Sequence, residues 1–361
     1  MNKTVLIFPA GMPRALEFLG RCQRQQQQVI GASSLAFDPS RPQYSAWLTL
    51  PYINHDEFDA SLAQAIRDLK VGGIYTPHPV IWEYLNRALE RIAPGVSLLN
   101  SSPANAELEG YRVAQTRAGA LLCNPLPLAV TRKPRADLTE VAVSSLYRHL
   151  EVMPGMCDHD KMRALYEVAR HCPAGDLVEI GTWWGKSAFI FLRLAQCFGI
   201  GNLLCVDPWS DTHLIQNDKN SLVDIASAQF SADEAFAVFQ INLLPYSCGD
   251  LNYLRMPSTE GANFYRTQRD VRTPAFGATS YTGRIALLHV DGNHSYESVN
   301  ADIAAWSDLV MDGGWIVIDD YIWSFGDGPK RVGDKFLTTN RDKISAAFVM
   351  GGALFIRWGA E

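Results

Sequence analysis

The sequence predicts an α/β protein built from two parallel-sheet domains. Short apolar stretches of strand length alternate with amphipathic stretches of helix length, which is the pattern of parallel βαβ units. A proline-containing segment with little periodicity, residues 124–137, interrupts this alternation. The chain of 361 residues is also long for a single hydrophobic core. These observations predict a smaller N-terminal domain at residues 1–123, a linker at residues 124–137 and a larger domain at residues 138–361.

Composition and charge indicate a globular protein and exclude several functional classes. Hydrophobic residues make up 47% of the chain and charged residues 19%, which is typical of packed domains. The net charge is -6 and lysine and arginine form no run, which argues against a nucleic-acid partner. No apolar stretch approaches the length of about 18 residues that a membrane span needs, and residues 5–8 are too short for a signal peptide. The seven cysteines are scattered without a C-x-x-C pair, which favours a reducing cytoplasm.

The N-terminal domain is predicted to contain three strands, at residues 4–8, 29–33 and 73–76. Helices with apolar faces are expected at residues 14–28, 56–69, 80–92 and 103–122. The segments FPAGMPRALEFLG and IYTPHPVIWEYL resemble the Rossmann-like domain that precedes the catalytic fold in ATP-grasp ligases. No ATP-grasp domain follows, so ligase activity is not implied. His78 lies between two prolines, where a locally bonded turn histidine is expected rather than a functional one.

The larger domain is organised around residues 177–187, LVEIGTWWGKS. Its first four residues are typical of a buried strand, Gly181 and Gly185 bracket a tight turn, and Ser187 begins a helix. Such a turn leaves backbone N–H groups free at the carboxyl end of a parallel strand, where nucleotides and nucleoside-like cofactors bind. Glycine turns also occur for purely structural reasons. The spacing is G-x-x-x-G and not the G-x-G-x-x-G that holds a pyrophosphate.

The next strand, residues 203–207, ends in Asp207. About twenty residues past the glycine turn, a strand-terminal acid faces the ribose of a bound nucleoside and accepts from both hydroxyls. The alternative is a helix N-cap. Pro208 and Trp209 follow Asp207 and no clear helix begins there, which favours the ligand role. A further loop at Asp250 is predicted at the same edge of the sheet.

Two later strands end in aspartates, the first in Asp291 and the second in the adjacent Asp319 and Asp320. Successive strand residues point to opposite faces, but at a frayed strand end both acids can turn toward one site. Clustered carboxylates repel one another unless a positive charge neutralises them. Their oxygen atoms suit Mg²⁺, Mn²⁺ or Ca²⁺. The alternative is an ion-pair network with the nearby Lys330 and Arg331.

The order of these blocks is more specific than any one of them. A C-terminal hairpin joined by Gly351 and Gly352 is predicted after them, at residues 345–358. The blocks VEIGTWWGKSA, CVDPWS, LLHVDGNHSYESVNADIAAW and GGWIVIDDYIW resemble class I S-adenosylmethionine-dependent methyltransferases. Within that class they are similar to the macrocin O-methyltransferase-like group and the related cephalosporin hydroxylase-like group. The resemblance implies a Rossmann-like methyltransferase sheet, mostly parallel with an antiparallel C-terminal hairpin. A long polar stretch at residues 255–283 departs from the family pattern.

The resemblance implies two sets of site residues. Cofactor contacts are implied at Glu179, Gly181, Thr182, Trp183, Gly185, Ser187, Asp207, Pro208, Trp209 and Asp250. A divalent metal, usually magnesium, is implied on Asp291, Asp319 and Asp320, with His294 and Asp291 as the catalytic residues. His294 is the implied base, although a lone histidine is often a structural loop residue.

The resulting hypothesis is a cytoplasmic O-methyltransferase that uses S-adenosyl-L-methionine and Mg²⁺, or Mn²⁺ or Ca²⁺, and acts on a hydroxyl of a sugar or natural-product small molecule. Neither a nucleic acid nor a membrane is expected as a partner, and a homo-oligomer is left open. The first domain is expected to shape the acceptor pocket or the oligomer. Two alternatives remain. One is an NAD(P)-dependent oxidoreductase, which would leave the paired aspartates without a role, and the other is a non-catalytic cofactor-binding scaffold of a biosynthetic complex.

Overall fold

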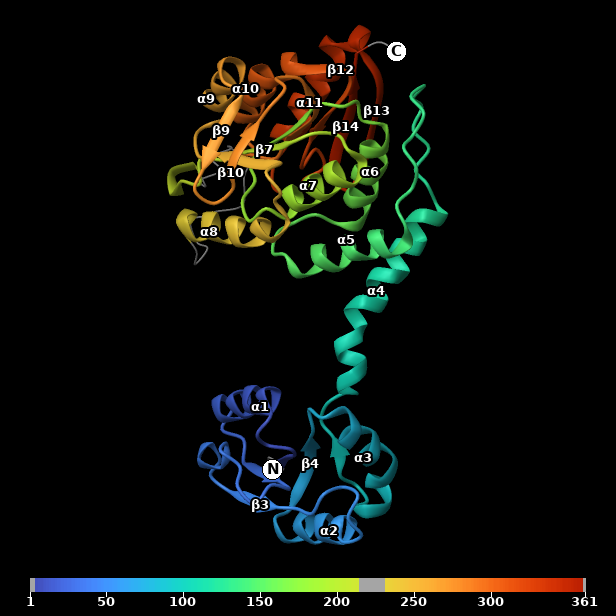
Figure 1. Ribbon diagram of the computed structural model, residues 1–361, viewed down its shortest axis with the longest axis vertical. Helices are drawn as coiled ribbons and strands as arrows, with labels where there is room; N and C mark the ends of the chain where they lie inside the picture. Colours follow the sequence, from blue (N-terminus) through green and yellow to red (C-terminus); the bar gives the residue numbers. More distant parts are fainter. Residues whose placement is uncertain (1–3, 214–230, 360–361) are drawn as a thin grey trace. The chain divides into compact units, whose positions relative to one another are not determined.

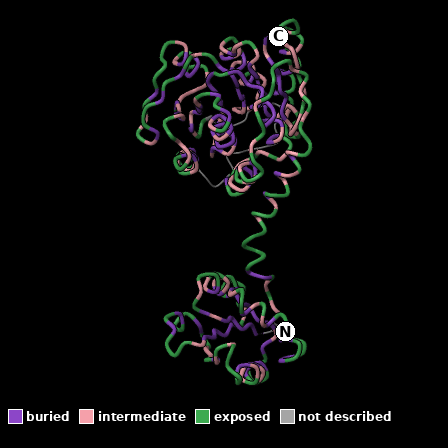
Figure 2. The backbone as a smooth tube through the Cα atoms, turned by 45° about the vertical axis from the view of Figure 1, so that its right-hand side comes forward, coloured by how far each residue is buried: buried purple, intermediate pink, exposed green. Residues whose placement is uncertain are grey.

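The computed structural model describes residues 4–213 and 231–359. The chain divides into two compact units, Met1–Arg112 and Val113–Glu361, and each has one main sheet with helices on both faces (Figure 1). Buried positions concentrate along the strands in each unit (Figure 2). Each unit therefore has a hydrophobic core of its own.

The first unit is built on a parallel sheet of order β3-β2-β1-β4-β5. Its strands are β1 (Thr4–Ile7), β2 (Val29–Ser33), β3 (Trp47–Thr49), β4 (Val71–Tyr75) and β5 (Ser97–Leu98). Its helices are α1 (Pro13–Arg24), α2 (Phe58–Asp68), α3 (Pro79–Ile92) and the first part of α4 (Pro103–Cys123). The three predicted strands are present. The two additional strands lie at the edges and are too short for an apolar pattern to reveal them.

Both faces of this sheet are covered, because successive strand residues point to opposite sides. Leu6 and Ile74 pack with α2 and α3, whereas Val5 and Ile7 pack with α1. The unit is therefore doubly wound, as expected of a Rossmann-like domain. His78 accepts a hydrogen bond from the backbone N–H of the third residue of α3, which is the local role expected of it.

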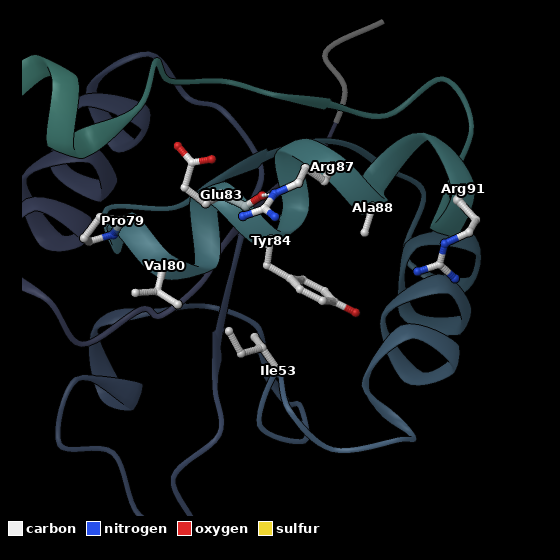
Figure 3. Close-up of a pocket in the computed structure, with 8 residues that line it drawn as sticks. All are labelled: Ile53, Pro79, Val80, Glu83, Tyr84, Arg87, Ala88 and Arg91. Atoms are coloured by element: carbon white, nitrogen blue, oxygen red, sulfur yellow. Dashed lines mark hydrogen bonds between the residues drawn. The ribbon is translucent and has the colours of Figure 1, made fainter.

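A pocket opens beside α3 in the first unit (Figure 3). It is lined by Ile53, Pro79, Val80, Glu83, Tyr84, Arg87, Ala88 and Arg91. The Tyr84 hydroxyl and the Arg91 guanidinium both donate to the carboxylate of Asp59, at 2.5 and 2.6 Å. These bonds tie α2 to α3. The pocket shares no residue with the candidate site in the second unit.

The second unit contains a seven-stranded sheet of order β13-β14-β12-β11-β6-β7-β8. The parallel strands are β6 (Asp176–Ile180), β7 (Leu203–Val206), β8 (Leu251–Leu254), β11 (Ile285–Val290) and β12 (Val310–Ile318). The strand β14 (Ala353–Trp358) is antiparallel to β12 and forms a hairpin with β13 (Ile344–Met350) across Gly351 and Gly352. The predicted mostly parallel sheet with a C-terminal hairpin is confirmed.

Helices cover both faces of the larger sheet. One face packs against the second part of α4, α5 (Glu140–Val152), α6 (His159–His171), α7 (Lys186–Phe198) and α8 (Ala232–Leu243). The other packs against α9 (Ser258–Thr267), α10 (Tyr296–Trp306) and α11 (Gly328–Thr339). Leu177 belongs to the first core, and Val178 and Ile180 belong to the second. Within the described residues, no helix combines the length and apolar composition of a membrane span.

The polar stretch at residues 255–283 is folded. It forms α9 and a two-stranded sheet of β9 (Asp270–Thr273) and β10 (Gly277–Ser280). The hydroxyls of Tyr265 and Thr282 donate to the carboxylate of Asp176, at 2.5 and 2.9 Å. Asp176 is the first residue of β6, so the later part of this stretch supports the amino edge of the sheet.

The boundary between the units lies inside α4 and not at residue 123, where the sequence placed it. Ala118 and Leu121 of α4 are buried in the core of the second unit, and Leu128 packs against that core. The Arg135 side chain donates to three backbone carbonyls at the end of α6. Residues 124–137 are therefore not a free linker. Prolines and weak periodicity also occur in an extended segment that is fixed to a core.

A fragment that begins at residue 113 should be more stable than one that begins at residue 138. The shorter fragment loses the buried part of α4 and the apolar residues after it, which stabilise the core by roughly 3–6 kcal/mol. Thermal unfolding followed by circular dichroism should show a Tm lower by roughly 10 °C or more for the shorter fragment. Equal Tm values would show that the α4 contacts contribute nothing to this core.

Candidate active site

The predicted site residues follow the carboxyl ends of parallel strands at one edge of the larger sheet. In the order Asp207, Gly181, Asp291 and Asp319, the residue after each strand donates its backbone N–H to the neighbouring strand, over 2.8–3.2 Å. This row of hydrogen bonds places four residues that are distant in sequence side by side. Open α/β sheets bind ligands in the crevice outside such strand ends.

The turn after β6 requires glycine. Gly181 has φ +76°, and a Cβ at this position would overlap the backbone of Asp291 in the adjacent strand end. Gly185 has φ +86° and precedes α7, and no side chain caps that helix among the residues described here. Ser187 lies in the first helical turn, whose N–H groups have no partner within the helix. The start of α7 therefore offers backbone donors to a ligand, whereas the N–H groups of Gly181 and Gly185 donate to other backbone carbonyls.

Asp207 organises this turn. Its carboxylate accepts from the backbone N–H groups of Thr182, Trp183 and Trp209, at 2.9, 3.0 and 2.7 Å. Burial raises the pKa of Asp207, although these backbone hydrogen bonds oppose the shift. A carboxylate offers about four acceptor positions, so capacity for about one more donor is left. A hydrogen bond from a ribose hydroxyl to Asp207 stays a prediction.

Trp209 is a core residue. Its side chain is only 1% exposed and packs against Phe239 and Tyr253. Its indole N–H donates to the carbonyl of Trp183 at 2.9 Å. Trp209 therefore supports the turn from the core side. Pro208, which lies between Asp207 and Trp209 in the sequence, is half-buried.

Asp250 lies at the opposite edge of the sheet. It precedes β8, its carbonyl accepts from the first residue of β7 at 2.8 Å, and its carboxylate accepts from Gln196 at 2.7 Å. The predicted cofactor contact is wrong, because the sequence pattern did not reveal β8 and placed Asp250 after a strand rather than before one. Arg255 and Met256 are the residues that follow β8 at the candidate site edge.

Four charged side chains form what we call the inner cluster: Glu179, His289, Asp319 and Lys161. His289 Nδ1 lies 3.1 Å from Glu179 Oε1, and its Nε2 lies 3.6 Å from Asp319 Oδ2. The Lys161 ammonium donates to the same Asp319 oxygen. These side chains are 0–8% exposed. Glu179, which was expected to contact the cofactor, is instead the partner of a buried histidine.

The positive charges of Lys161 and His289 offset the negative charges of the carboxylates in the inner cluster. Burial raises the pKa of Asp319, but the Lys161 ammonium and His289 outweigh burial and hold this pKa well below its usual range. Burial lowers the pKa of Lys161, but the Asp319 and Asp291 carboxylates raise it above its usual value. Burial and Lys161 lower the pKa of His289, but Asp319 and Glu179 raise it to about 9. Lys161 and Asp319 therefore form a buried ion pair.

Sequence reasoning missed Lys161 and named other cations. Lys330 and Arg331 are about half exposed and pair with acids of their own segment, at 3.1 and 3.7 Å. The sequence does carry a signal for the lysine, because Lys161 shares a helical stripe with the buried Leu165 and Val168. A lysine on the apolar face of a helix needs a buried partner.

Asp291, His294 and Asp320 form what we call the outer cluster, whose ligand atoms lie within 4.8 Å of one another. His294 Nε2 is 2.7 Å from Asp320 Oδ2 and 3.7 Å from Asp291 Oδ1. These side chains are 12–32% exposed. Asp320 lies two residues after the end of β12 and has a left-handed backbone, with φ +51°. The His294 ring also stacks on Trp323, with centroids 4.6 Å apart.

The two aspartates of the outer cluster raise the pKa of its histidine. Burial and the charge of Asp319 raise the pKa of Asp291 to about 7. Burial lowers the pKa of His294, but Asp291 and Asp320 raise it to about 9. This pKa favours a protonated imidazole at neutral pH.

The donor set of the outer cluster fits a divalent cation. The two carboxylates suit magnesium or manganese, with His294 beside them, and the partial exposure leaves positions for a substrate oxygen. The group His289, Asp291 and Asp319 also meets this distance. That second group already contains the Lys161 ammonium, 3.8 Å from Asp291 and hydrogen-bonded to Asp319.

Solved structures with a similar fold include several methyltransferases. The calicheamicin methyltransferase CalS11 is 16% identical, with 73% of this chain and 95% of that chain covered and a TM-score of 0.43. The O-methyltransferase NovP is 13% identical, with 70% and 99% covered and a TM-score of 0.38. The MycE methyltransferase of the mycinamycin pathway, in complex with Mg, SAH and mycinamycin VI, is 15% identical, with 55% and 48% covered and a TM-score of 0.32.

Comparison with curated proteins finds no match. Residues 178–321, which are less than half of the chain, match a family model described as a methyltransferase domain. The matched range runs from β6 through Asp320 and so contains the glycine turn and the whole outer cluster. With the seven-stranded sheet and its antiparallel hairpin, this match identifies the second unit as a class I S-adenosylmethionine-dependent methyltransferase domain.

Proposed function

We propose that this enzyme transfers the methyl group of S-adenosylmethionine to a hydroxyl of a sugar or natural-product small molecule, assisted by a divalent cation at the outer cluster. The observation that carries the proposal is the contact between the two halves of the site. The glycine turn of β6 lies against the backbone of Asp291, which belongs to the outer cluster. A cofactor at the turn and an acceptor at the cluster would therefore be neighbours.

The cofactor side of the site is assigned to the segment from Gly181 to Ser187. The backbone donors at the start of α7 suit the carboxylate and the hydroxyls of S-adenosylmethionine, and Asp207 fixes the turn that leads into this helix. The bound sulfonium supplies an activated methyl group. The side chains of Thr182 and Trp183 are placed on the same turn.

On the acceptor side, His294 is the proposed base. Its Nε2 is held by Asp320 and its ring by Trp323, so the imidazole is oriented before a substrate binds. A divalent cation at the carboxylates would lower the pKa of a coordinated hydroxyl. With the charges of Asp291 and Asp320 neutralised, His294 can be neutral at pH 7 and accept the hydroxyl proton.

Replacement of Asp207 by asparagine should weaken S-adenosylmethionine binding. The amide side chain would retain one acceptor oxygen and direct an N–H₂ group toward backbone N–H groups that now donate to the carboxylate. The loss of a hydrogen bond to a charged group costs about 1.5–3 kcal/mol, which corresponds to a roughly 10- to 150-fold weaker affinity. Calorimetric titration of the folded variant tests this. An unchanged affinity would remove Asp207 from the cofactor site.

The function is tested by transfer of labelled methyl from S-adenosylmethionine to a panel of catechols and sugar diols, with Mg²⁺ and with excess EDTA. Transfer that requires Mg²⁺ supports the proposal. Tight NAD(H) binding without S-adenosylmethionine binding would favour the oxidoreductase alternative. Binding of S-adenosylmethionine without transfer to any diol would favour a cofactor-binding scaffold.

The first unit contributes none of the residues assigned here. We also propose that the first unit takes part in acceptor binding or oligomerisation, that the protein is cytoplasmic, and that it belongs to the macrocin O-methyltransferase-like group. Turnover by the fragment 113–361 on the same acceptors would show that the first unit is not needed for chemistry.

A further inference from the structure

We propose that Lys161 is a positioning residue that holds Asp319 out of the cation site, so that Asp291 and Asp320 are the only two of the three aspartates that bind the divalent cation. This inference rests on the proposed function for the identity of the cation. The pairing of Lys161 with Asp319 does not depend on it.

The Lys161 backbone is fixed on two sides. Its N–H donates to the Asp158 carboxylate, the N-cap of α6, at 2.7 Å. The hairpin turn at Gly351 is packed so closely against it that a Cβ there would overlap the Lys161 backbone. The Lys161 side chain is 3% exposed. Because it is enclosed in this way, its ammonium has little freedom to leave the carboxylates.

Strand alternation explains why Asp319 is the partner. Trp315 and Val317 belong to the core beneath α6 and α7, and Asp319 continues the same side of β12. Asp320, the next residue, has a left-handed backbone, and its carboxylate lies 2.7 Å from His294 Nε2. The two adjacent acids are thus divided between the inner and the outer cluster.

Exposure separates the two clusters further. The Asp319 side chain is 8% exposed, whereas those of Asp291 and Asp320 are 22% and 32% exposed. A cation that also receives a substrate oxygen needs open positions, which only the outer cluster offers. A divalent ion on Asp319 would also have to share that carboxylate with the ammonium that is hydrogen-bonded to it, and the two positive charges would repel each other at close range. The same ammonium lies farther from the Asp291 carboxylate, at 3.8 Å.

The first test measures Mn²⁺ affinity of the full-length protein by electron paramagnetic resonance. Asp320→Asn should weaken Mn²⁺ binding at least tenfold, whereas Asp319→Asn should change it less than threefold. Lys161→Met frees Asp319 and should strengthen binding at least fivefold. Equal losses in the two aspartate variants, with no gain in Lys161→Met, would show that Asp319 is a ligand and overturn the inference.

The second test examines the ion pair without any metal, by Tm in EDTA. Lys161→Met leaves the buried Asp319 carboxylate with only His289 as a cationic partner, at 3.6 Å, and should lower the Tm by roughly 8 °C or more. The double variant Lys161→Met/Asp319→Asn should recover at least half of this loss. The half-exposed Lys330, which pairs with Asp334 on its own helix, supplies the control Lys330→Met, whose Tm should stay within about 2 °C. No recovery in the double variant would overturn the pairing.

The two tests separate failure of this inference from failure of the proposed function. If the wild type binds no Mn²⁺ but Lys161→Met does, the ammonium replaces the metal. The cation half of the proposed function then fails, while the pairing of Lys161 with Asp319 stands. If neither protein binds Mn²⁺, the assignment of cation ligands is overturned together with the metal, whatever the Tm values show.

Discussion

Replacement of Asp320 by asparagine should reduce methyl transfer by about three orders of magnitude while S-adenosylmethionine affinity changes less than threefold. The carboxylate supplies a hard oxygen ligand and orients His294 across 2.7 Å. Without it the acceptor hydroxyl would keep a pKa far above neutrality, since bound cations lower such values by several units. Asparagine is the cleaner variant because it tolerates the left-handed backbone at φ +51°, which alanine would strain. Single-turnover transfer and calorimetry measure the two quantities.

A matched control is available in the same segment. Asp327 is 51% exposed and pairs with Arg331 at 3.7 Å. Asp327→Asn should therefore leave both transfer and affinity unchanged. Equal turnover in the wild type and Asp320→Asn would exclude the outer cluster from the chemistry, and a parallel loss of cofactor affinity would place Asp320 on the cofactor side instead.

Replacement of Gly181 by alanine should have the largest effect on the fold of the site. At φ +76° the new Cβ would overlap the carbonyl group of Asp291. The backbone of Asp291 cannot move aside without separating β6 from β11. A left-handed non-glycine residue together with a backbone overlap costs about 3–5 kcal/mol. The Tm should fall by roughly 10 °C, and S-adenosylmethionine affinity should fall at least 100-fold.

Gly119 provides a control at which alanine should increase stability instead of decreasing it. It lies within α4, and a Cβ there would meet no atom within 4 Å. Gly119→Ala should therefore raise stability by about 0.5–1 kcal/mol, because alanine is the better helix former. A Gly181→Ala variant with normal Tm and normal cofactor binding would show that the turn can accommodate a Cβ at this position, contrary to this prediction.

The order of most strands and helices could be predicted, because apolar periodicity and glycine turns are properties of short sequence segments. The strand before Gly181, the strands before Asp291 and Asp319 and the Gly351–Gly352 hairpin each rest on a short segment of sequence. The strand β8 did not emerge, since Leu251–Leu254 is only four residues long and Asn252 interrupts its apolar residues. That omission moved Asp250 to the wrong edge of the sheet.

Partners of buried charges were harder to predict, because they depend on packing between segments distant in sequence. Lys161 meets Asp319 only because α6 covers the face to which that aspartate points. Glu179 faces His289 because β6 and β11 are neighbours in register. Sequence spacing therefore indicated that the acids gather at one edge, but not how they divide between two clusters.

The most direct test of the proposed chemistry is a crystal structure with S-adenosylhomocysteine and Mn²⁺, using anomalous scattering to locate the metal. We expect the cofactor product at the turn that begins with Gly181 and one manganese peak between the carboxylates of Asp291 and Asp320. A structure with the cofactor product bound at saturating Mn²⁺, but without an anomalous peak at these two carboxylates, would contradict the assignment of a cation-assisted methyl transfer to this site.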